Sequence, residues 1–204
     1  ITLGTGASVS GTGEYGEVSL VSQTGEIDLM DGASILSTGL IGIDAQGLRR
    51  GTGTAIEAQK AMALTSDRLY LADADHAAAI TDGLVVDDAL MAGFSRLENL
   101  FLTGREQIGF AGVLTLDVPA LSLDTPLVAD VTTIGTGGTT ITARTVTLQN
   151  IQSDSAGADT YGANAGTIAV SADEIIIGPG HLRFSGYETI GLNALNNVIF
   201  TGAG

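Results

Sequence analysis

One block of sequence occurs twice in the chain, ninety residues apart. The first copy runs from Phe94 to Gly112 and the second from Phe184 to Gly202. Aligned without a gap, the copies share six identical residues, and three further positions stay apolar. The identical pairs are Phe94/Phe184, Ser95/Ser185, Glu98/Glu188, Leu102/Leu192, Phe110/Phe200 and Gly112/Gly202, and the apolar pairs are Leu97/Tyr187, Leu100/Ile190 and Ile108/Val198. A repeat of this kind predicts stacked structural units.

The repeat extends upstream, so that residues 64–112 correspond to residues 171–202. Ser66–Leu71 and Ala172–Ile177 both have an acidic residue in second place before an apolar end. The first copy, however, carries sixteen more residues between this segment and the phenylalanine that opens the block. Stacked repeats tolerate such insertions, because each unit contacts mainly its neighbours. We therefore predict either one additional coil at about residues 72–93 or a side loop, in the form of a loop or short helix that protrudes from the stack.

The composition favours short strands and tight turns. The 204 residues include 29 glycines, about twice the usual ~7% share, but no Trp, no Cys and a single lysine, Lys60. β-branched residues are interrupted by glycine at short intervals, which favours strands over helices. The net charge of −15 argues against nucleic acid and anionic membrane surfaces as partners. No apolar run is long enough for membrane insertion.

Alternating residues predict the first strands. Glu17–Val21 and Glu26–Met30 each place two apolar side chains on one face, with a turn at residues 23–25. Residues 55–63 have helix-favouring composition, but they resemble the strand-like segment 141–147 and are predicted as a strand. Residues 153–166 are poor in apolar residues and are predicted as a second side loop.

A seven-residue unit follows the first long copy and is itself repeated. It reads Leu-Thr-Leu-Asp-Val-Pro-Ala at residues 114–120 and Leu-Ser-Leu-Asp-Thr-Pro-Leu at residues 121–127. In each unit we expect the two leucines to point inward, the aspartate to accept hydrogen bonds at a turn and the proline to end strand pairing at a corner.

The order of these motifs resembles the repeat region of filamentous-haemagglutinin-type large exoproteins, which reach the surface of Gram-negative bacteria by two-partner secretion. The resemblance covers mainly residues 64–204. It rests on the order and composition of the repeated motifs and includes no catalytic motif. It implies a right-handed parallel β-helix that is exported across the outer membrane and serves as an adhesin stalk or the shaft of a contact-dependent toxin. The family's secretion domain and any C-terminal toxin have no counterpart in residues 1–204.

The physics of the pattern points to the same architecture. Short strands with glycine corners suit a β-solenoid, in which each coil pairs with the next. With ~20 residues per coil and ~4.8 Å between coils, the chain would make a rod of ~10 coils and roughly 50 Å. We expect residues 1–204 to be one β-helical segment of a longer chain, with the aromatic rings of Phe94, Phe110, Phe184 and Phe200 inside it.

Carboxylates concentrate in one segment, and their oxygens are of the type that Ca²⁺ binds. The segment departs from the EF-hand pattern, because Ala77 stands at the third ligand position, and it lacks the nonapeptides of calcium β-rolls. The sequence therefore leaves open a calcium site or a solvated acidic loop. The acidic residues are Asp73, Asp75, Asp82, Asp87 and Asp88, and they surround His76.

No residue pattern in the chain predicts a catalytic, cofactor or metal site. His76 and His181 are the only histidines, and no Gly-x-Ser-x-Gly elbow is present. Glu98 and Glu188 occupy matching repeat positions, which predicts a structural role such as capping turn amides, spaced apart along the rod.

We therefore expect a non-catalytic shaft of a secreted bacterial surface adhesin or extracellular filament. Its partners would be neighbouring repeats of the same chain, or identical subunits stacked as a filament, and a receptor or glycan on a host or neighbouring cell. The alternative is a β-helical polysaccharide-degrading enzyme or a tailspike-like carbohydrate-binding protein, which would gather several acids around an arginine in a groove.

Overall fold

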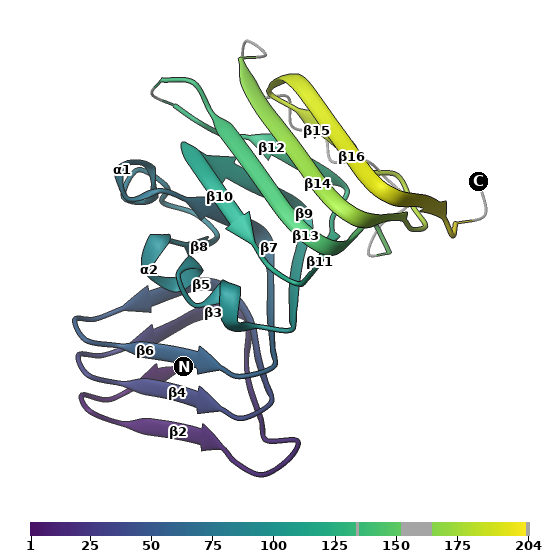
Figure 1. The fold of residues 1–204 in the computed structure, drawn as a ribbon. Coiled ribbons are helices and arrows are strands. Elements are labelled where there is room, and N and C mark those ends of the chain that lie inside the picture. Colours follow the sequence, from purple (N-terminus) through teal and green to yellow (C-terminus); the bar gives the residue numbers. More distant parts are fainter. Residues whose placement is uncertain (134, 152–164, 203–204) are drawn as a thin grey trace.

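The computed structural model describes residues 1–133, 135–151 and 165–202, and in it the chain is mostly β, as predicted (Figure 1). All strand pairings between the described residues are parallel. The strands form one sheet of 13 strands and a second sheet made of β2, β4 and β6. This is a β-helix-like arrangement in which successive turns of chain lie on one another.

The bounds of the elements follow the chain. The strands are β1 (Thr2–Leu3), β2 (Ser8–Gly11), β3 (Glu17–Leu29), β4 (Ser34–Ser37), β5 (Leu40–Arg50), β6 (Ala55–Ala58), β7 (Ala61–Ala72), β8 (Leu84–Val86), β9 (Asn99–Ala111), β10 (Val113–Asp117), β11 (Ala120–Asp124), β12 (Leu127–Asp130), β13 (Gly138–Gln149), β14 (Gly166–Ile177), β15 (Arg183–Ser185) and β16 (Tyr187–Phe200). The helical turns are α1 (Ala74–Ala77), α2 (Asp88–Met91) and the 3₁₀ turn η1 (Phe94–Arg96).

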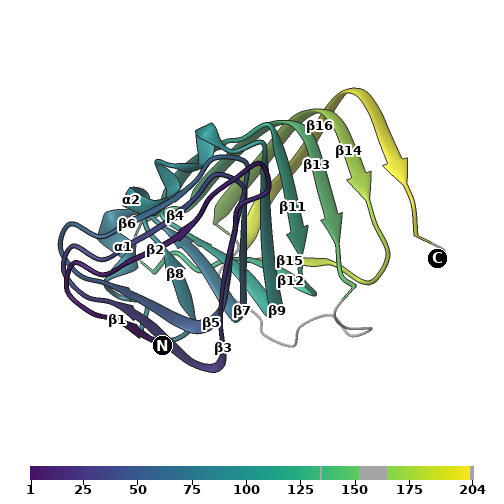
Figure 2. The ribbon, with the colours of Figure 1, turned by 90° about the horizontal axis from the view of Figure 1, so that it is seen from below.

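The pairings sort the strands into three stacks, which the chain visits in turn. Stack A holds the first halves of β3, β5, β7 and β9, then β11 and the second halves of β13, β14 and β16. Stack B holds β1, the second halves of β3, β5, β7 and β9, and β8, β12 and β15. Stack C holds β2, β4 and β6 and, further along, β10 and the first halves of β13, β14 and β16. Seen from below, the coils follow one another along the molecule (Figure 2).

Two columns of apolar side chains run the length of stack A, one residue from each coil. Apart from the first and the last residue of each column, the side chains are at most 2% exposed, except for Ile177, which is half-buried. Such columns result from a fixed register, because a slip of one residue would turn every side chain to the other face. The columns are Val18, Ile41, Met62, Leu100, Leu121, Val146, Ile175, Val198 and Leu20, Ile43, Leu64, Leu102, Leu123, Leu148, Ile177, Phe200.

Stack A contains eight coils, so the rod is shorter than the sequence predicted. Seven spacings of ~4.8 Å give about 34 Å, shorter than the roughly 50 Å expected. The reason lies in two long connections that add no coil to stack A. Ala61 of β7 pairs directly with Asn99 of β9, and Leu148 of β13 pairs with Ile177 of β14.

The prediction that all four repeat phenylalanines are buried is partly wrong. Phe94 and Phe110 are each 1% exposed, and Phe184 is half-buried with its ring edge against Tyr187. Phe200, by contrast, is 76% exposed, because it lies in the last described coil and no described strand covers that side of it.

The long repeat is real at the level of local structure. Ser66 pairs with Gly104, and the equivalent Ala172 pairs with Ala194. After each of these pairs the register shifts in the same way, so that the later strand carries one extra residue at the bend. The matching segments 66–71 and 172–177 are thus the bends and second halves of the longer strands β7 and β14. The two copies nevertheless differ in place: β9 bends from stack A to stack B, whereas β16 bends from stack C to stack A.

The predicted insertion contains short helices, but it does not simply protrude. Its middle forms β8, in which Leu84 and Val86 are fully buried. β8 pairs with the second half of β7, where Leu69 lies opposite Leu84. The pairing of β5 with β7 stops at Asp44 and Thr65, and β8 lies at this point against β5 as well as β7. The insertion therefore adds a strand to stack B, in agreement with the alternative of an additional coil, and the apolar run Leu84-Val-Val86 forms that strand.

Other sequence predictions have mixed outcomes. Residues 55–63 are strands, as predicted, with a break at Gln59–Lys60. Residues 23–25 do not separate two strands, because β3 runs through them with a register irregularity. The two seven-residue units contribute β10 to stack C and β11 to stack A, and all five of their leucines are at most 3% exposed. Of the predicted loop 153–166, residues 153–164 lie outside the described residues, and Gly166 begins β14.

Candidate functional site

The acidic segment is organised by helix capping. Asp73 precedes α1, and its carboxylate accepts a hydrogen bond from the backbone N–H of His76 at 3.1 Å. The same carboxylate contacts the Nδ1 atom of His76 at 2.6 Å and accepts from the N–H of Val113 at 3.1 Å. These hydrogen bonds outweigh the effect of desolvation and hold the pKa of Asp73 below its usual value. Asp73 thus fastens the insertion to the corner between β9 and β10.

Asp82, Asp87 and Asp88 of the segment are also engaged in structural contacts. Asp87 caps α2 through the N–H of Leu90 at 3.0 Å, and both of its carboxylate oxygens contact the Nη2 atom of Arg50. Asp88 accepts from the N–H of Ala74 at 3.0 Å, which links the two helical turns. Asp82 lies 3.2 Å from Nη1 of Arg68.

These contacts tie the acidic segment to the neighbouring coils and engage carboxylate oxygens that a calcium ion would need. Within residues 1–133, 135–151 and 165–202, no three His, Asp or Glu side chains are grouped so that they could hold a metal ion. His181 lies away from the segment, in an exposed turn where its backbone carbonyl accepts from the side chain of Asn150 at 2.9 Å. The structure therefore does not bring the two histidines together.

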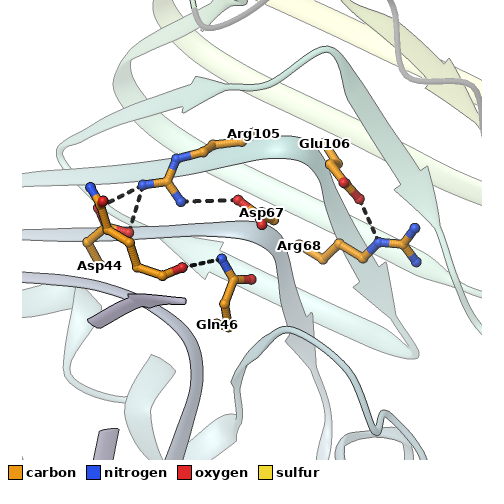
Figure 3. Close-up of polar contacts among 7 residues, drawn as sticks. Asp44, Gln46, Asp67, Arg68, Arg105 and Glu106 are labelled. Carbon is orange, nitrogen blue, oxygen red and sulfur yellow. Dashed lines mark hydrogen bonds and ion pairs between the residues drawn. The ribbon is translucent and has the colours of Figure 1, made fainter. Parts of the chain in front are cut away.

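A second cluster, unforeseen from the sequence, lies where β5, β7 and β9 bend between stacks A and B (Figure 3). Arg105 of β9 places its Nη2 atom 2.7 Å from both carboxylate oxygens of Asp44 of β5. Its Nη1 atom lies 3.3 Å from Asp67, which belongs to the intervening strand β7. Arg105 therefore connects three successive coils. We call the cluster of Asp44, Asp67, Arg68, Arg105 and Glu106 the corner ladder.

The corner ladder continues on both sides of Arg105. Arg68 donates from Nε to Glu106 at 2.9 Å, in the same view (Figure 3), and also reaches Asp82 of the insertion. Towards β3, Gln23 donates to Asp44 at 3.3 Å, and Gln46 donates to the backbone carbonyl of Gln23 at 2.7 Å. Glu106 accepts a hydrogen bond from Arg68, and Asp44 accepts from Arg105; each of these hydrogen bonds raises the pKa of the guanidinium that donates it.

The corner ladder gathers acids around an arginine, which is the feature that a carbohydrate-active alternative requires. Its carboxylates, however, are already engaged by guanidinium groups, and a general acid or nucleophile needs a carboxylate directed at substrate. None of the ladder residues lines the described cavities of about 510, 290 and 410 Å³. The arrangement is suited to fastening coils together.

The largest of these cavities, of about 510 Å³, lies between the insertion and the turn after β5. Its charged lining residues are Arg50 and Asp87, which form an ion pair with each other. Glu98 and Glu188, predicted to cap turns, are both exposed, and they lie at the starts of strand segments in stacks A and C. They do not converge on one site.

Sequence reasoning missed the corner ladder because its partners are far apart in the chain. Asp44 and Arg105 are separated by 61 residues. One local signal was available: the polar run Gly104–Gln107 interrupts an otherwise apolar copy and marks the bend. Which acids face that bend depends on the lengths of the intervening coils.

Comparisons with known proteins give no relative on which an assignment could rest: no family model, no curated protein and no solved structure matches the chain. In the part of the chain that the structure describes, no helix has the length and apolar character needed to cross a membrane.

Proposed function

We propose that this chain is a shaft segment, a right-handed parallel β-helix, of a secreted bacterial surface adhesin or extracellular filament. The observation that carries the proposal is the pair of eight-membered apolar columns in stack A. They join distant parts of the chain into a single stack with a constant register.

A shaft has to resist bending and stretching, and the interactions along the stacks serve this purpose. Backbone hydrogen bonds run from coil to coil, and a buried leucine or isoleucine in a column contributes about 1.5–3 kcal/mol by hydrophobic transfer. The corner ladder adds ion pairs in the same direction, from β5 across β7 to β9. The exposed positions are mainly polar, which suits a surface in contact with water.

The location is tested in the organism that encodes the protein. An antibody against residues 1–204 should label intact cells or the culture medium, and protease added to intact cells should remove the signal. A strictly cytoplasmic protein, protected from protease until the cells are lysed, would contradict the proposal.

The carbohydrate-active alternative makes a different prediction, because of the acids around Arg105. It expects the purified chain to release sugar products from one member of a panel of bacterial and host polysaccharides, and Asp44→Asn to abolish that release. We expect no release from any member. Sensitivity to Asp44→Asn in this assay would replace the shaft with an enzyme.

A further inference from the structure

Within the described residues, the last coil has a strand edge that no other strand covers. In the part of the chain that the structure describes, β16 pairs with β14 alone. Its inward side chains continue the buried columns, yet Ile190, Leu192, Val198 and Phe200 are 45%, 40%, 50% and 76% exposed. Protein edge strands are normally protected by charges, prolines or a covering segment. β16 has no proline and only one charged residue, Glu188, so that it offers a strand edge and an apolar surface together.

The opposite end of the molecule has a coil of the same layout. The first coil consists of β1, β2 and the first half of β3, which lie in stacks B, C and A in that order. The last coil consists of β15 and the two halves of β16, which also lie in stacks B, C and A in that order. The first and the last coil therefore visit the three stacks in the same order, so the first coil of a second copy could continue all three stacks.

We propose that the surface of β15 and β16 binds the β1–β3 coil of a second copy of this chain, head to tail and in register. This inference rests on the proposed filament function and names its partner. Stack A fixes the register, since Val198 would be followed by Val18 of the next copy and Phe200 by Leu20. In stack C, Leu192 would be followed by Val9, which heads the column Val9, Ile35, Ile56.

The two contact surfaces are different patches of the molecule, so the contact does not close on itself. Head-to-tail contacts that continue along an axis generate open filaments. Pairing between two β16 edges would instead produce a closed dimer, and it would break the parallel columns that all described coils follow. The net charge of −15 makes copies repel one another, so we expect association to strengthen as salt screens this repulsion.

The test uses two variants, each blocked at one end. Val198→Lys/Phe200→Lys places charges on the β16 surface, and Leu20→Lys does so on the β3 surface. Matched controls are Leu195→Lys, at an 80% exposed position outside the paired register of β16, and Val21→Lys, at a 54% exposed position next to Leu20. Circular dichroism and thermal melts establish that each variant folds, and sedimentation at several concentrations measures mass.

Wild type and both controls should form species whose mass grows with protein concentration. Each blocked variant alone should keep the mass of one chain. Mixed in equal amounts, the two blocked variants should form a species of two chains and no larger, because one intact surface remains on each. Association of the Leu20→Lys variant with itself into a dimer would show pairing between β16 edges and would overturn the proposal, as would a monomeric wild type at all concentrations and salt levels.

Failure of this proposal can be told from failure of the proposed function. A monomeric chain that is nevertheless found on the cell surface would contradict the stacking of copies but not the proposed shaft function. A chain that assembles in vitro but stays in the cytoplasm would contradict the secreted shaft but not the stacking of copies.

Discussion

Arg105 and Asp44 form a two-oxygen contact, at 2.7 Å to each carboxylate oxygen, although 61 residues separate them in the chain. Neither residue lies on a strand paired with the other, because β7 stands between β5 and β9. The pair thus holds together coils that the backbone ladder joins only indirectly. Both side chains are partly buried, with exposures of 29% and 20%, which shields their attraction from solvent more than at an open surface.

The first prediction concerns this pair. Arg105→Gln should lower the free energy of unfolding by about 1–2 kcal/mol, since a charge-assisted pair is lost in a partly buried place. A double-mutant cycle with Asp44→Asn should give a coupling energy of about 1 kcal/mol. The control is the exposed pair of Arg49 and Glu26, at 72% and 43%, for which the coupling should be close to zero. Equal coupling energies in the two cycles would contradict the claim that partial burial makes the pair of Arg105 and Asp44 more stabilising than an exposed pair.

The second prediction separates the two phenylalanines that the repeat places in equivalent positions. Phe110→Ala should cost about 3–5 kcal/mol, because the ring is 1% exposed and its removal leaves a cavity. Phe200→Ala should change stability by no more than about 0.5 kcal/mol in the isolated chain, because Phe200 is 76% exposed. Urea unfolding of both variants measures the difference. Similar losses would mean that Phe200 is covered in the single chain.

The third prediction concerns glycines with positive φ. Gly180 has φ +89°, and a Cβ atom there would lie 1.8 Å from the backbone oxygen of Asn150. Gly53 has φ +70° with open space around it. Gly53→Ala should cost about 1–2 kcal/mol from backbone strain alone, whereas Gly180→Ala should cost clearly more, because the backbone must also move. Thermal melts compare the two, and a smaller loss for Gly180→Ala would contradict the close packing at this corner.

The fourth prediction is a dependence on pH. The folded pKa of Asp73 is lowered, so its stabilising effect is complete above its unfolded value of about 3.9 and is lost as pH falls through the lower folded value. The stability difference between wild type and Asp73→Asn should therefore shrink as pH falls from about 4 to about 2, where the carboxylate is protonated. Urea unfolding across this range measures it. A difference that stays unchanged down to pH 2 would exclude the carboxylate as its source.

The repeat predicted the local structure of the two copies, but it did not predict which stacks each copy occupies. The equivalent pairs Ser66/Gly104 and Ala172/Ala194 sit at the same bend with the same extra residue. The stack that each copy occupies could not be predicted, because it depends on the accumulated length of all earlier coils. Between the two copies the chain turns a corner after β10 and another after β11. As a result, the long strands before these corners bend between stacks A and B, whereas the later long strands bend between stacks C and A.

The candidate sites show the same division. The acidic segment was visible in the sequence, and its aspartates are where short-range rules place them, at the starts of α1 and α2. The corner ladder was invisible, since its ion pairs cross 38 and 61 residues of chain. The sequence also placed Leu20 and Phe200 as inward residues, and the structure places them in the first and the last described coil of stack A.

The sequence by itself determined that this protein consists of short strands in repeated units, with alternating apolar residues and glycine corners. Those features follow from interactions within a few residues, which every copy carries with it. Only the tertiary structure decided which strands became neighbours, where β8 entered stack B and which acids met Arg105. The physical reason is that contacts between coils depend on a common register, and that register is set by the whole length of chain between them.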